Sequence, residues 1–262
     1  MTATREIRFD NGAEYEQTMG RWSSLVGTRF LDWLAVPAGR NWIDIGCGNG
    51  AFTEIVVAQS APSSVVALDP SEGQIAFARQ RSGCRMAEFS IGEATRLEHP
   101  DQSFDVATMA LVLFFVREPA KGVAEMRRVV RPGGMVAAYV WDIPRGGFPY
   151  EAVWSEMQDL GVATPRPPSV EIARMEALKR LWHEAGLQDV ETKEFVVERT
   201  YASFEAYWTG LQTLHSAAQI AEMGADTRQE LRRRLEARLP SDAAGRVRYS
   251  ARANAVKGRV PA

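Results

Sequence analysis

Alternation of short apolar runs with helix-forming segments constrains the fold of this chain more than any other feature. The runs are rich in β-branched or apolar residues, are bounded by turn residues, and span 41–45, 64–69, 84–91, 104–111 and 134–141. Helical spacing fills 51–60, 71–81 and 118–130, whereas 92–103 has the composition of a loop. The runs are apolar throughout, as strands buried on both faces are. We therefore expect a doubly wound α/β fold with a mostly parallel sheet and helices on both faces.

The rest of the chain predicts two further strands and several helices. The Pro- and Gly-rich residues 142–169 surround one helix, 175–186 form a helix that Gly186 ends, and 203–240 are helical; 187–201 and 245–258 are the sixth and seventh strands. Residues 13–36 predict an amphipathic helix closed by Pro37. We expect one domain over 1–262, with an N-terminal helical lid in 1–38, a ligand-binding core in 40–142, and substrate-covering helical insertions with the last two strands in 143–262.

Composition narrows the class of protein. With 262 residues, 45% of them hydrophobic, 24% charged and a net charge of −2, the chain has the profile of an ordinary globular enzyme, so no nucleic-acid partner is expected. Cys47 and Cys84 lack metal-ligand spacing, and the start has no apolar stretch of signal-peptide type, so we expect no metal and a cytoplasmic location. The longest apolar run, 109–116, is far below the roughly 18 residues of a membrane helix, so no membrane insertion is expected. Nothing indicates the oligomeric state.

The stretch "DIGCGNG", residues 44–50, follows the first predicted strand. Its glycines allow a close approach of the backbone to a ligand at the start of a helix. Gly46, Gly48 and Ala51 also satisfy the fingerprint of a dinucleotide-binding loop, so the spacing alone leaves two ligands open. Asp44 separates them, because a carboxylate facing a pyrophosphate would cost about 1–4 kcal/mol. A ligand without phosphate that carries an ammonium or sulfonium group fits better.

Four segments in order resemble one known family. They are "DIGCGNG", "ALDPSEGQIAFAR" at 67–79, "IGEATRLEHPDQSFDVATMALVLFF" at 91–115 and "MRRVVRPGGMVAAYVW" at 126–141. Together they resemble the class I S-adenosylmethionine-dependent methyltransferases, close to the small-molecule type of ubiquinone and menaquinone biosynthesis. The resemblance covers about residues 40–142, and it implies a Rossmann-like sheet that binds S-adenosylmethionine and releases S-adenosylhomocysteine.

The resemblance also implies a cofactor role for residues that match the family motifs. Those expected around the methionine part and the adenosine part are Asp44, Gly46, Cys47, Gly48, Gly50, Asp69, Pro70, Ser71, Gly92, Glu93, Ala94, Ala110 and Leu111. Asp69 would accept hydrogen bonds from both ribose hydroxyls, and Glu93 and Ala94 would face the adenine. The family usually has aspartate where this chain has Glu93. Tyr15, Arg21 and Trp22 would close over the cofactor, although an amphipathic helix would contain the same residues.

The expected acceptor side is mainly apolar. Many relatives have a histidine after the fourth strand, where this chain has Phe114 and Phe115. That difference removes a candidate base, so no catalytic residue is assigned, and it favours an apolar acceptor or one whose acidity needs no help. Packing in the core is the alternative role for Phe114 and Phe115. Trp154 and His215 are further candidates for substrate contact, with packing as the alternative for both.

These observations predict methyl transfer to an oxygen or carbon of a small, partly apolar metabolite. Relatives that methylate amino groups of bases or glutamine carry Asn-Pro-Pro-Tyr or a near variant after the fourth strand, and residues 109–112 here are Met-Ala-Leu-Val. Two alternatives stay open: a catalytically silent adenosylmethionine-binding protein and an NAD-dependent oxidoreductase, which Asp44 disfavours.

Overall fold

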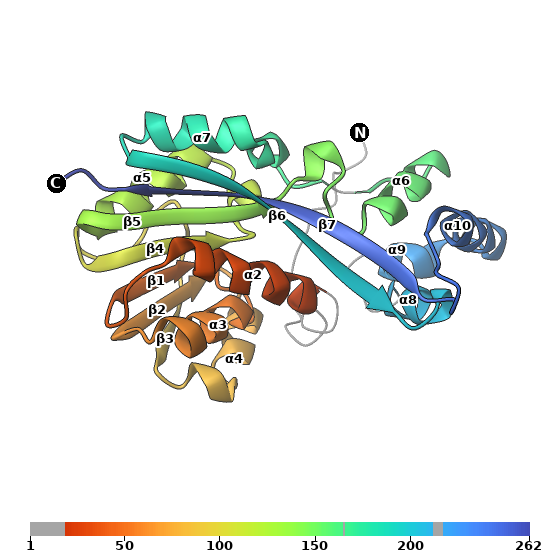
Figure 1. The fold of residues 1–262 in the computed structure, drawn as a ribbon, viewed down its shortest axis with the longest axis horizontal. Helices are drawn as coiled ribbons and strands as arrows, with labels where there is room; N and C mark the ends of the chain where they lie inside the picture. The colour runs from red at the N-terminus through yellow and green to blue at the C-terminus, as the bar shows by residue number, and fades with distance from the viewer. Residues whose placement is uncertain (1–18, 165, 212–216) are drawn as a thin grey trace.

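The computed structural model describes residues 19–164, 166–211 and 217–262, and its centre is one seven-stranded sheet (Figure 1). The strands are β1 (Asn41–Ile45), β2 (Ser64–Asp69), β3 (Ala87–Ile91), β4 (Phe104–Ala110), β5 (Val130–Trp141), β6 (Gln188–Tyr201) and β7 (Val247–Arg259). Their order across the sheet is β3-β2-β1-β4-β5-β7-β6. β1 to β5 pair in parallel, and β7 runs antiparallel between β5 and β6. The doubly wound, mostly parallel fold expected from the sequence is confirmed.

Helices cover both faces of the sheet. On one face lie α2 (Arg21–Leu34), α3 (Ala51–Ser60) and α4 (Glu72–Ala78), and on the other lie α5 (Pro119–Val129) and α7 (Met175–Glu184) (Figure 1). Ser71 caps α4 by accepting a hydrogen bond from the Gln74 amide at 3.3 Å, and Pro119 occupies the first turn of α5, both as the sequence indicates. Among the described residues, no helix is long and apolar enough to span a bilayer.

An aromatic group locks α2 to the sheet. The Phe30 ring lies 4.8 Å from the Tyr139 ring of β5 and 6.0 Å from the Phe52 ring of α3, centroid to centroid. Phe30 and Tyr139 are fully buried, and each buried large side chain contributes about 2–3 kcal/mol. Gly27 permits the close approach, since a Cβ there would lie 3.1 Å from Phe52. The helix before β1 therefore belongs to one layer of the domain, and it packs on α3, β6 and β7.

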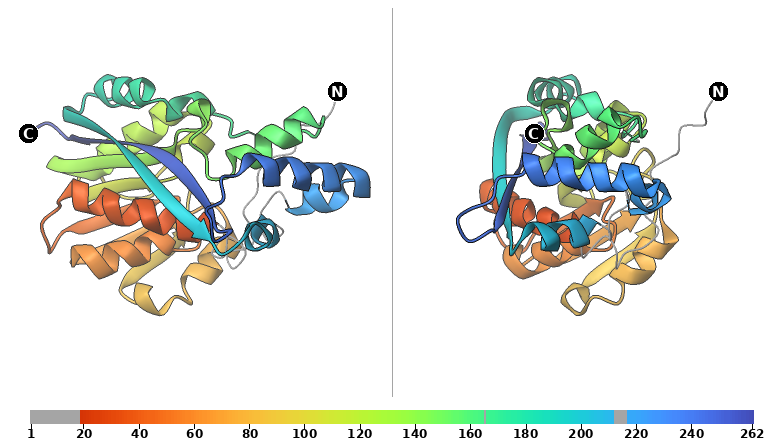
Figure 2. Two further views of the ribbon diagram at one scale, coloured as in Figure 1. Left: turned by 45° about the vertical axis from the view of Figure 1, so that its right-hand side comes forward. Right: turned by 90° about the vertical axis from the view of Figure 1, so that its right-hand side faces the viewer.

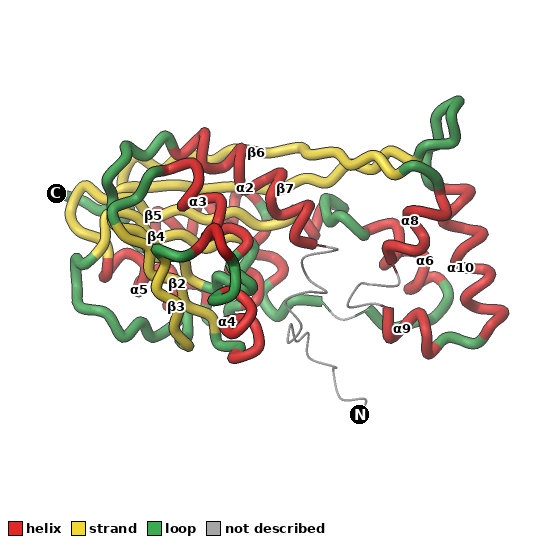
Figure 3. The backbone as a smooth tube through the Cα atoms, turned by 90° about the horizontal axis from the view of Figure 1, so that it is seen from below, coloured by secondary structure: helices red, strands yellow, loops and turns green. Residues whose placement is uncertain are grey.

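The remaining helices form a cap at one end of the molecule. They are α6 (Glu151–Asp159), α8 (Phe204–Leu211), α9 (Ala217–Glu222) and α10 (Ala225–Arg238). The carboxyl ends of the parallel strands point toward this cap (Figures 1 and 2). Pairing between β5 and β7 stops at Trp141 and Ala253, but β6 and β7 stay paired to Tyr201 and Val247. This two-stranded extension links the sheet to the cap, as the tube in Figure 3 shows.

Two strand starts differ clearly from the predicted ones. β3 begins at Ala87, because Ser82–Cys84 form a short 3-10 helix instead of strand. β5 begins at Val130 instead of Gly134, so it includes the Arg-Pro-Gly-Gly segment before the predicted strand. A bulge lets Val130 pair with Phe104 before Met135 pairs with Val106. The lid expected of residues 1–38 stays a prediction, because α2 lies on a face of the sheet and residues 1–18 lie outside the described residues.

The end of α2 tests the helix geometry. Ala35 is exposed and holds a left-handed conformation at φ +50°, with its N–H donating to the Leu31 carbonyl at 3.1 Å. We expect Ala35→Gly to raise the free energy of unfolding by about 1 kcal/mol, because glycine adopts this conformation without steric cost. Ala124→Gly, at an exposed position inside α5, should lower it by about 1 kcal/mol. Urea unfolding measures both changes. An equal decrease in the free energy of unfolding in the two variants would contradict the left-handed conformation of Ala35.

Candidate functional site

The glycine loop, residues 46–50, joins β1 to α3. Gly46, Gly48 and Gly50 all have positive φ, at +74°, +53° and +81°. The N–H groups of Gly46 and Cys47 donate to the Leu68 carbonyl at 2.7 and 2.9 Å, so the loop is bound to the end of β2. Because side chains disfavour these backbone angles, the glycines that the sequence singled out are required by the turn itself.

The two sides of this loop differ in how they are filled. A Cβ on Gly46 would lie 2.5 and 2.6 Å from the two methyl carbons of Val112, whereas a Cβ on Gly48 would meet no atom within 4 Å. Val112 belongs to the segment after β4, so Gly46 gives that segment room to pack on the loop. The Gly48 side faces open space, which a ligand can occupy.

Asp44, the fourth residue of β1, is buried at 1% exposure. Its Oδ2 accepts a hydrogen bond from the Thr53 hydroxyl of α3 at 2.6 Å. Its Oδ1 is buried with no hydrogen-bond partner. Burial raises the pKa of this carboxyl to about 7, and the nearby Asp69 charge adds to the rise. The Thr53 hydrogen bond and the Thr108 hydroxyl oppose it. An acid poised near neutrality with an unused oxygen is a binding group for a cation.

Asp69, the last residue of β2, fixes the loop from the other side. Its Oδ2 accepts from the Gly48 N–H and its Oδ1 from the Ser71 N–H, both at 2.9 Å. Burial raises the pKa of Asp69, while these two backbone donors lower it. A carboxylate has about four acceptor positions, so two stay available after both bonds. Asp69 therefore aligns the loop with the start of α4 and can still accept from a ligand.

The third motif lies beside Asp69. The Gly92 N–H donates to the Asp69 carbonyl at 3.2 Å, and the exposed Glu93 contributes to the raised pKa of Asp69. Pro70 is exposed and Ala94 is half-buried. Glu93 lies close enough to Asp69 to act on it electrostatically, so the second and third motifs adjoin at one edge of the sheet.

The segment after β4 is held from two directions. Leu111 is buried at φ +63°, a strained angle for a non-glycine residue, and its N–H donates to the Tyr139 carbonyl at 2.8 Å. Val112 packs on Gly46, as described above. Ser169 clamps the far side: its N–H donates to the Phe114 carbonyl at 3.0 Å and its hydroxyl to the Val116 carbonyl at 2.8 Å.

The two phenylalanines of this segment have different environments. Phe114 is 3% exposed and belongs to the core, whereas Phe115 is half-buried. Their rings lie 4.6 Å apart and nearly perpendicular. Ala110, which precedes the segment, is half-buried too. Of the pair, Phe115 has the surface that a substrate could contact.

The other sequence candidates are less directly connected with the glycine loop. Trp22 is fully buried, 6.3 Å from the Tyr249 ring, with the Arg199 guanidinium 5.4 Å over it. Arg21 is exposed, and the half-buried Trp154 stacks on Phe148 at 4.3 Å. Tyr15 and His215 lie outside the described residues. Cofactor or substrate contact by these residues stays a prediction.

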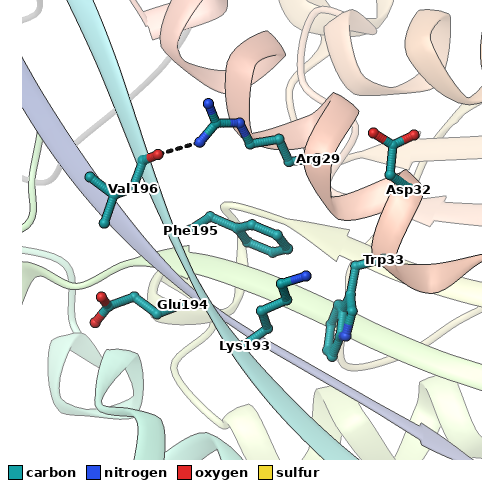
Figure 4. Close-up of a pocket in the computed structure, with 7 residues that line it drawn as sticks. All are labelled: Arg29, Asp32, Trp33, Lys193, Glu194, Phe195 and Val196. Atoms are coloured by element: carbon teal, nitrogen blue, oxygen red, sulfur yellow. Dashed lines mark hydrogen bonds between the residues drawn. The ribbon is translucent and has the colours of Figure 1, made fainter.

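Cys47 and Cys84 are free and buried, and burial raises the pKa of both thiols. No cluster of metal-ligating side chains exists among the described residues. A depression of about 430 Å³ lies elsewhere, between α2 and the outer strand β6, where Arg29 donates to the Val196 carbonyl beside Trp33 and Phe195 (Figure 4). None of its lining residues comes from the loops at the carboxyl ends of β1, β2 and β4.

Three contributors lacked any sequence signal. Thr53, Val112 and Ser169 come from different elements, and only the tertiary structure brings them to the loop or to the segment after β4. Thr53 and Val112 lie in segments that the sequence singled out, but nothing in their spacing indicates these contacts. Ser169 is 53 residues from its carbonyl partner, so no spacing rule reaches it.

Part of the chain is similar to proteins of known family. Residues 43–138 match the family model described as a methyltransferase domain. The demethylmenaquinone methyltransferase of Renibacterium salmoninarum is 35% identical over 136 residues, which are 52% of this chain and 54% of the relative. The chain thus spans about half the length of the curated relatives it matches.

Solved structures share the fold at low identity. A Haemonchus contortus phosphoethanolamine N-methyltransferase in complex with S-adenosylhomocysteine has a TM-score of 0.59 and 15% identity, covering 98% of this chain and 59% of that one. The [4+2]-cyclase SpnF has a TM-score of 0.55 and 18% identity, covering 96% of both chains. The same architecture therefore occurs in proteins with different named activities.

The buried Asp44 predicts a pH effect on stability. Its pKa is about 7 in the folded state and near 3.8 in the unfolded state, so the folded chain retains a proton that the unfolded chain loses. Stability from this group is therefore lost as the pH rises from about 4 to 7. We expect Asp44→Asn to gain roughly 2–3 kcal/mol relative to the unsubstituted chain between pH 5 and pH 8. Urea unfolding at both pH values measures this, and parallel pH profiles would contradict it.

Proposed function

We propose that this chain, whose core belongs to the class I S-adenosylmethionine-dependent methyltransferase family, transfers a methyl group to an oxygen or carbon of a small, partly apolar metabolite. The observation that carries the proposal is the unpartnered Oδ1 of buried Asp44 at the base of the glycine loop. A buried acceptor without a partner is unfavourable by about 1–3 kcal/mol, and a ligand ammonium group would remove that penalty.

The residues present fit the cofactor. The open side of Gly48 accommodates a ligand against bare backbone, and the loop amides are already engaged by Asp69 and Leu68 instead of pointing at a phosphate. Two carboxyl groups, Asp44 and Asp69, would both face a pyrophosphate, which argues against the NAD alternative. We assign Asp44 and the glycine loop to the methionine part of the cofactor.

The remaining assignments follow the same edge of the sheet. The free acceptor positions of Asp69 would take the ribose hydroxyls, with Pro70 and Ser71 beside them, and Glu93 with the Ala94 amide would face the adenine. Ala110 and the strained Leu111 would lie under the reacting centre. The support for this arrangement is that Asp69 bonds to the Gly48 and Ser71 amides, so the first two motifs are held at hydrogen-bond distance.

S-adenosylmethionine, when bound, supplies a methyl group on a positively charged sulfur. The chain itself contributes alignment and exclusion of water, and holding two reactants in line can be worth about 7–11 kcal/mol. Phe115 offers an apolar surface for the acceptor, and Ser169 holds the segment that carries it. We assign no general base, so an acceptor that arrives protonated needs one from outside the residues described here or must be acidic already.

We also propose the division of the chain into a cover in 1–38, a cofactor core in 40–142 and a substrate cover in 143–262, and activity in the cytoplasm, where the two free cysteines stay reduced. The cap helices stand at the carboxyl edge of the parallel strands, where ligands bind in open α/β sheets.

Calorimetric titration tests the function. We expect S-adenosylhomocysteine to bind with a dissociation constant in the micromolar range and NAD to show no heat of binding. Asp69→Ala should weaken S-adenosylhomocysteine by about 1–3 kcal/mol, because buried ribose hydroxyls lose their acceptor. Turnover of labelled S-adenosylmethionine on a panel of phenols, enols and carboxylic acids separates an enzyme from a silent binder. Binding of NAD alone would overturn the proposal.

The two sides of the glycine loop provide a matched pair of variants. Gly48→Ala should weaken S-adenosylhomocysteine at least about tenfold and lower stability by only about 1–2 kcal/mol, because its methyl enters the ligand space. Gly46→Ala should lower stability more, since its methyl collides with Val112, and Val112→Ala should restore part of the loss. Thermal unfolding and calorimetry on the four proteins measure both effects, and equal affinities in Gly48→Ala and the unsubstituted chain would place the ligand elsewhere.

A further inference from the structure

Four of the six tyrosines gather where the β6–β7 extension meets the cap. Tyr201 ends β6, Tyr249 lies on β7, Tyr207 lies on α8 and Tyr150 directly precedes α6. The Tyr207 ring lies 5.1 Å from the Tyr201 ring and 6.3 Å from the Tyr249 ring. Phenol rings from separate elements thus lie close together. Figure 3 shows the β6–β7 extension reaching the cap helices.

Two polar atoms in this group have no partner. Tyr207 is 1% exposed, and its hydroxyl has no hydrogen bond in the described structure. The Oε2 of Glu151, the first residue of α6, is also buried without one. The Tyr207 ring lies 6.3 Å from the Tyr249 ring, and the Tyr249 hydroxyl accepts the N–H of Ala152, the residue after Glu151, at 3.1 Å, so both residues lie beside Tyr249. Buried hydroxyls and carboxylates normally have partners, and two orphans at one place indicate a missing ligand group.

The surroundings define what that group can be. The negative charge of Glu151 disfavours an anionic ligand group. The positive charges of Arg166 and Arg238, which both interact electrostatically with Glu151, disfavour a cationic one. A neutral hydroxyl can donate to the carboxylate and exchange a hydrogen bond with the Tyr207 phenol. The rings of Tyr201, Phe204 and Tyr249 surround Tyr207 and suit an apolar body attached to that hydroxyl.

We infer that Tyr207 and Glu151 form a subsite for a neutral hydroxyl group on the far end of the acceptor. The inference rests on the proposed function, because the subsite binds the acceptor of the methyl transfer. It narrows the acceptor to an uncharged hydroxylated molecule with an apolar body. Tyr207 and Glu151 are specificity residues in this account and take no part in the transfer itself.

Tyr249 supplies the structural contrast. Its hydroxyl accepts the Ala152 N–H at 3.1 Å, so it is engaged within the fold. Removing the Tyr249 hydroxyl should therefore lower the unfolding midpoint. Removing the unpartnered Tyr207 hydroxyl should leave the unfolding midpoint unchanged or raise it. The substitution eliminates a buried polar group whose desolvation no hydrogen bond offsets. A purely structural role for Tyr207 predicts the opposite.

Binding of three rigid probes tests the subsite. They are 4,4′-dihydroxybiphenyl, 4-hydroxybiphenyl and biphenyl-4-carboxylate, each titrated into the free chain and into the chain saturated with S-adenosylhomocysteine. We expect the dihydroxy compound to bind about tenfold more tightly than the monohydroxy compound, the value of one hydrogen bond. Tyr207→Phe should reduce that ratio to about one, whereas Tyr249→Phe should keep it. Glu151→Gln should improve binding of the carboxylate.

The outcomes are distinct. A ratio that Tyr207→Phe leaves unchanged, or failure of all three probes to bind the unsubstituted chain, overturns the subsite. A chain that shows the Tyr207-dependent ratio but does not bind S-adenosylhomocysteine retains the subsite and loses the proposed function. A lower unfolding midpoint in Tyr207→Phe than in Tyr249→Phe also contradicts the inference.

Discussion

A buried carboxylate with one unused oxygen is the constraint on which the rest of this site depends. Asp44 is on a central strand, between β2 and β4, and is 1% exposed. Burial raises its pKa to about 7 and makes a positive group favourable beside it. The loop that follows has glycine at three of its five positions, 46, 48 and 50. Stability and ligand affinity are thus opposed at this residue, as is common at functional sites.

Asp69 fixes the conformation of the loop, because its carboxylate accepts hydrogen bonds from two backbone amides. It joins Gly48 to Ser71, and so couples the turn after β1 to the helix after β2. On the opposite side, Val112 fills the space that Gly46 leaves. A single loop is therefore in contact with three strand ends. Because these contacts come from different βα units, the conformation of the loop depends on the assembled sheet and not on the loop sequence alone.

The core and the cap differ in what they share with known proteins. The core has the family features, while a cyclase with a different named activity shares the overall architecture. In the function we propose, the choice of acceptor would depend on side chains beyond the sheet edge, such as the tyrosines on the β6–β7 extension. Ser169, which lies between α6 and α7, bonds the Phe114 and Val116 carbonyls and so holds the segment after β4 from that side.

The sequence by itself determined the sheet, its crossovers and the glycine loop, because strand and helix periodicity and the need for positive φ are local properties. The β3 and β5 boundaries escaped it, since a bulge and a 3-10 turn depend on neighbours such as Phe104. Only the tertiary structure decided that Thr53 bonds to Asp44, that Asp69 also binds backbone, and that Trp22 is buried against Tyr249. Those contacts join residues far apart in the chain. Their energies come from burial and desolvation, which cannot be derived from the spacing of residues in the sequence.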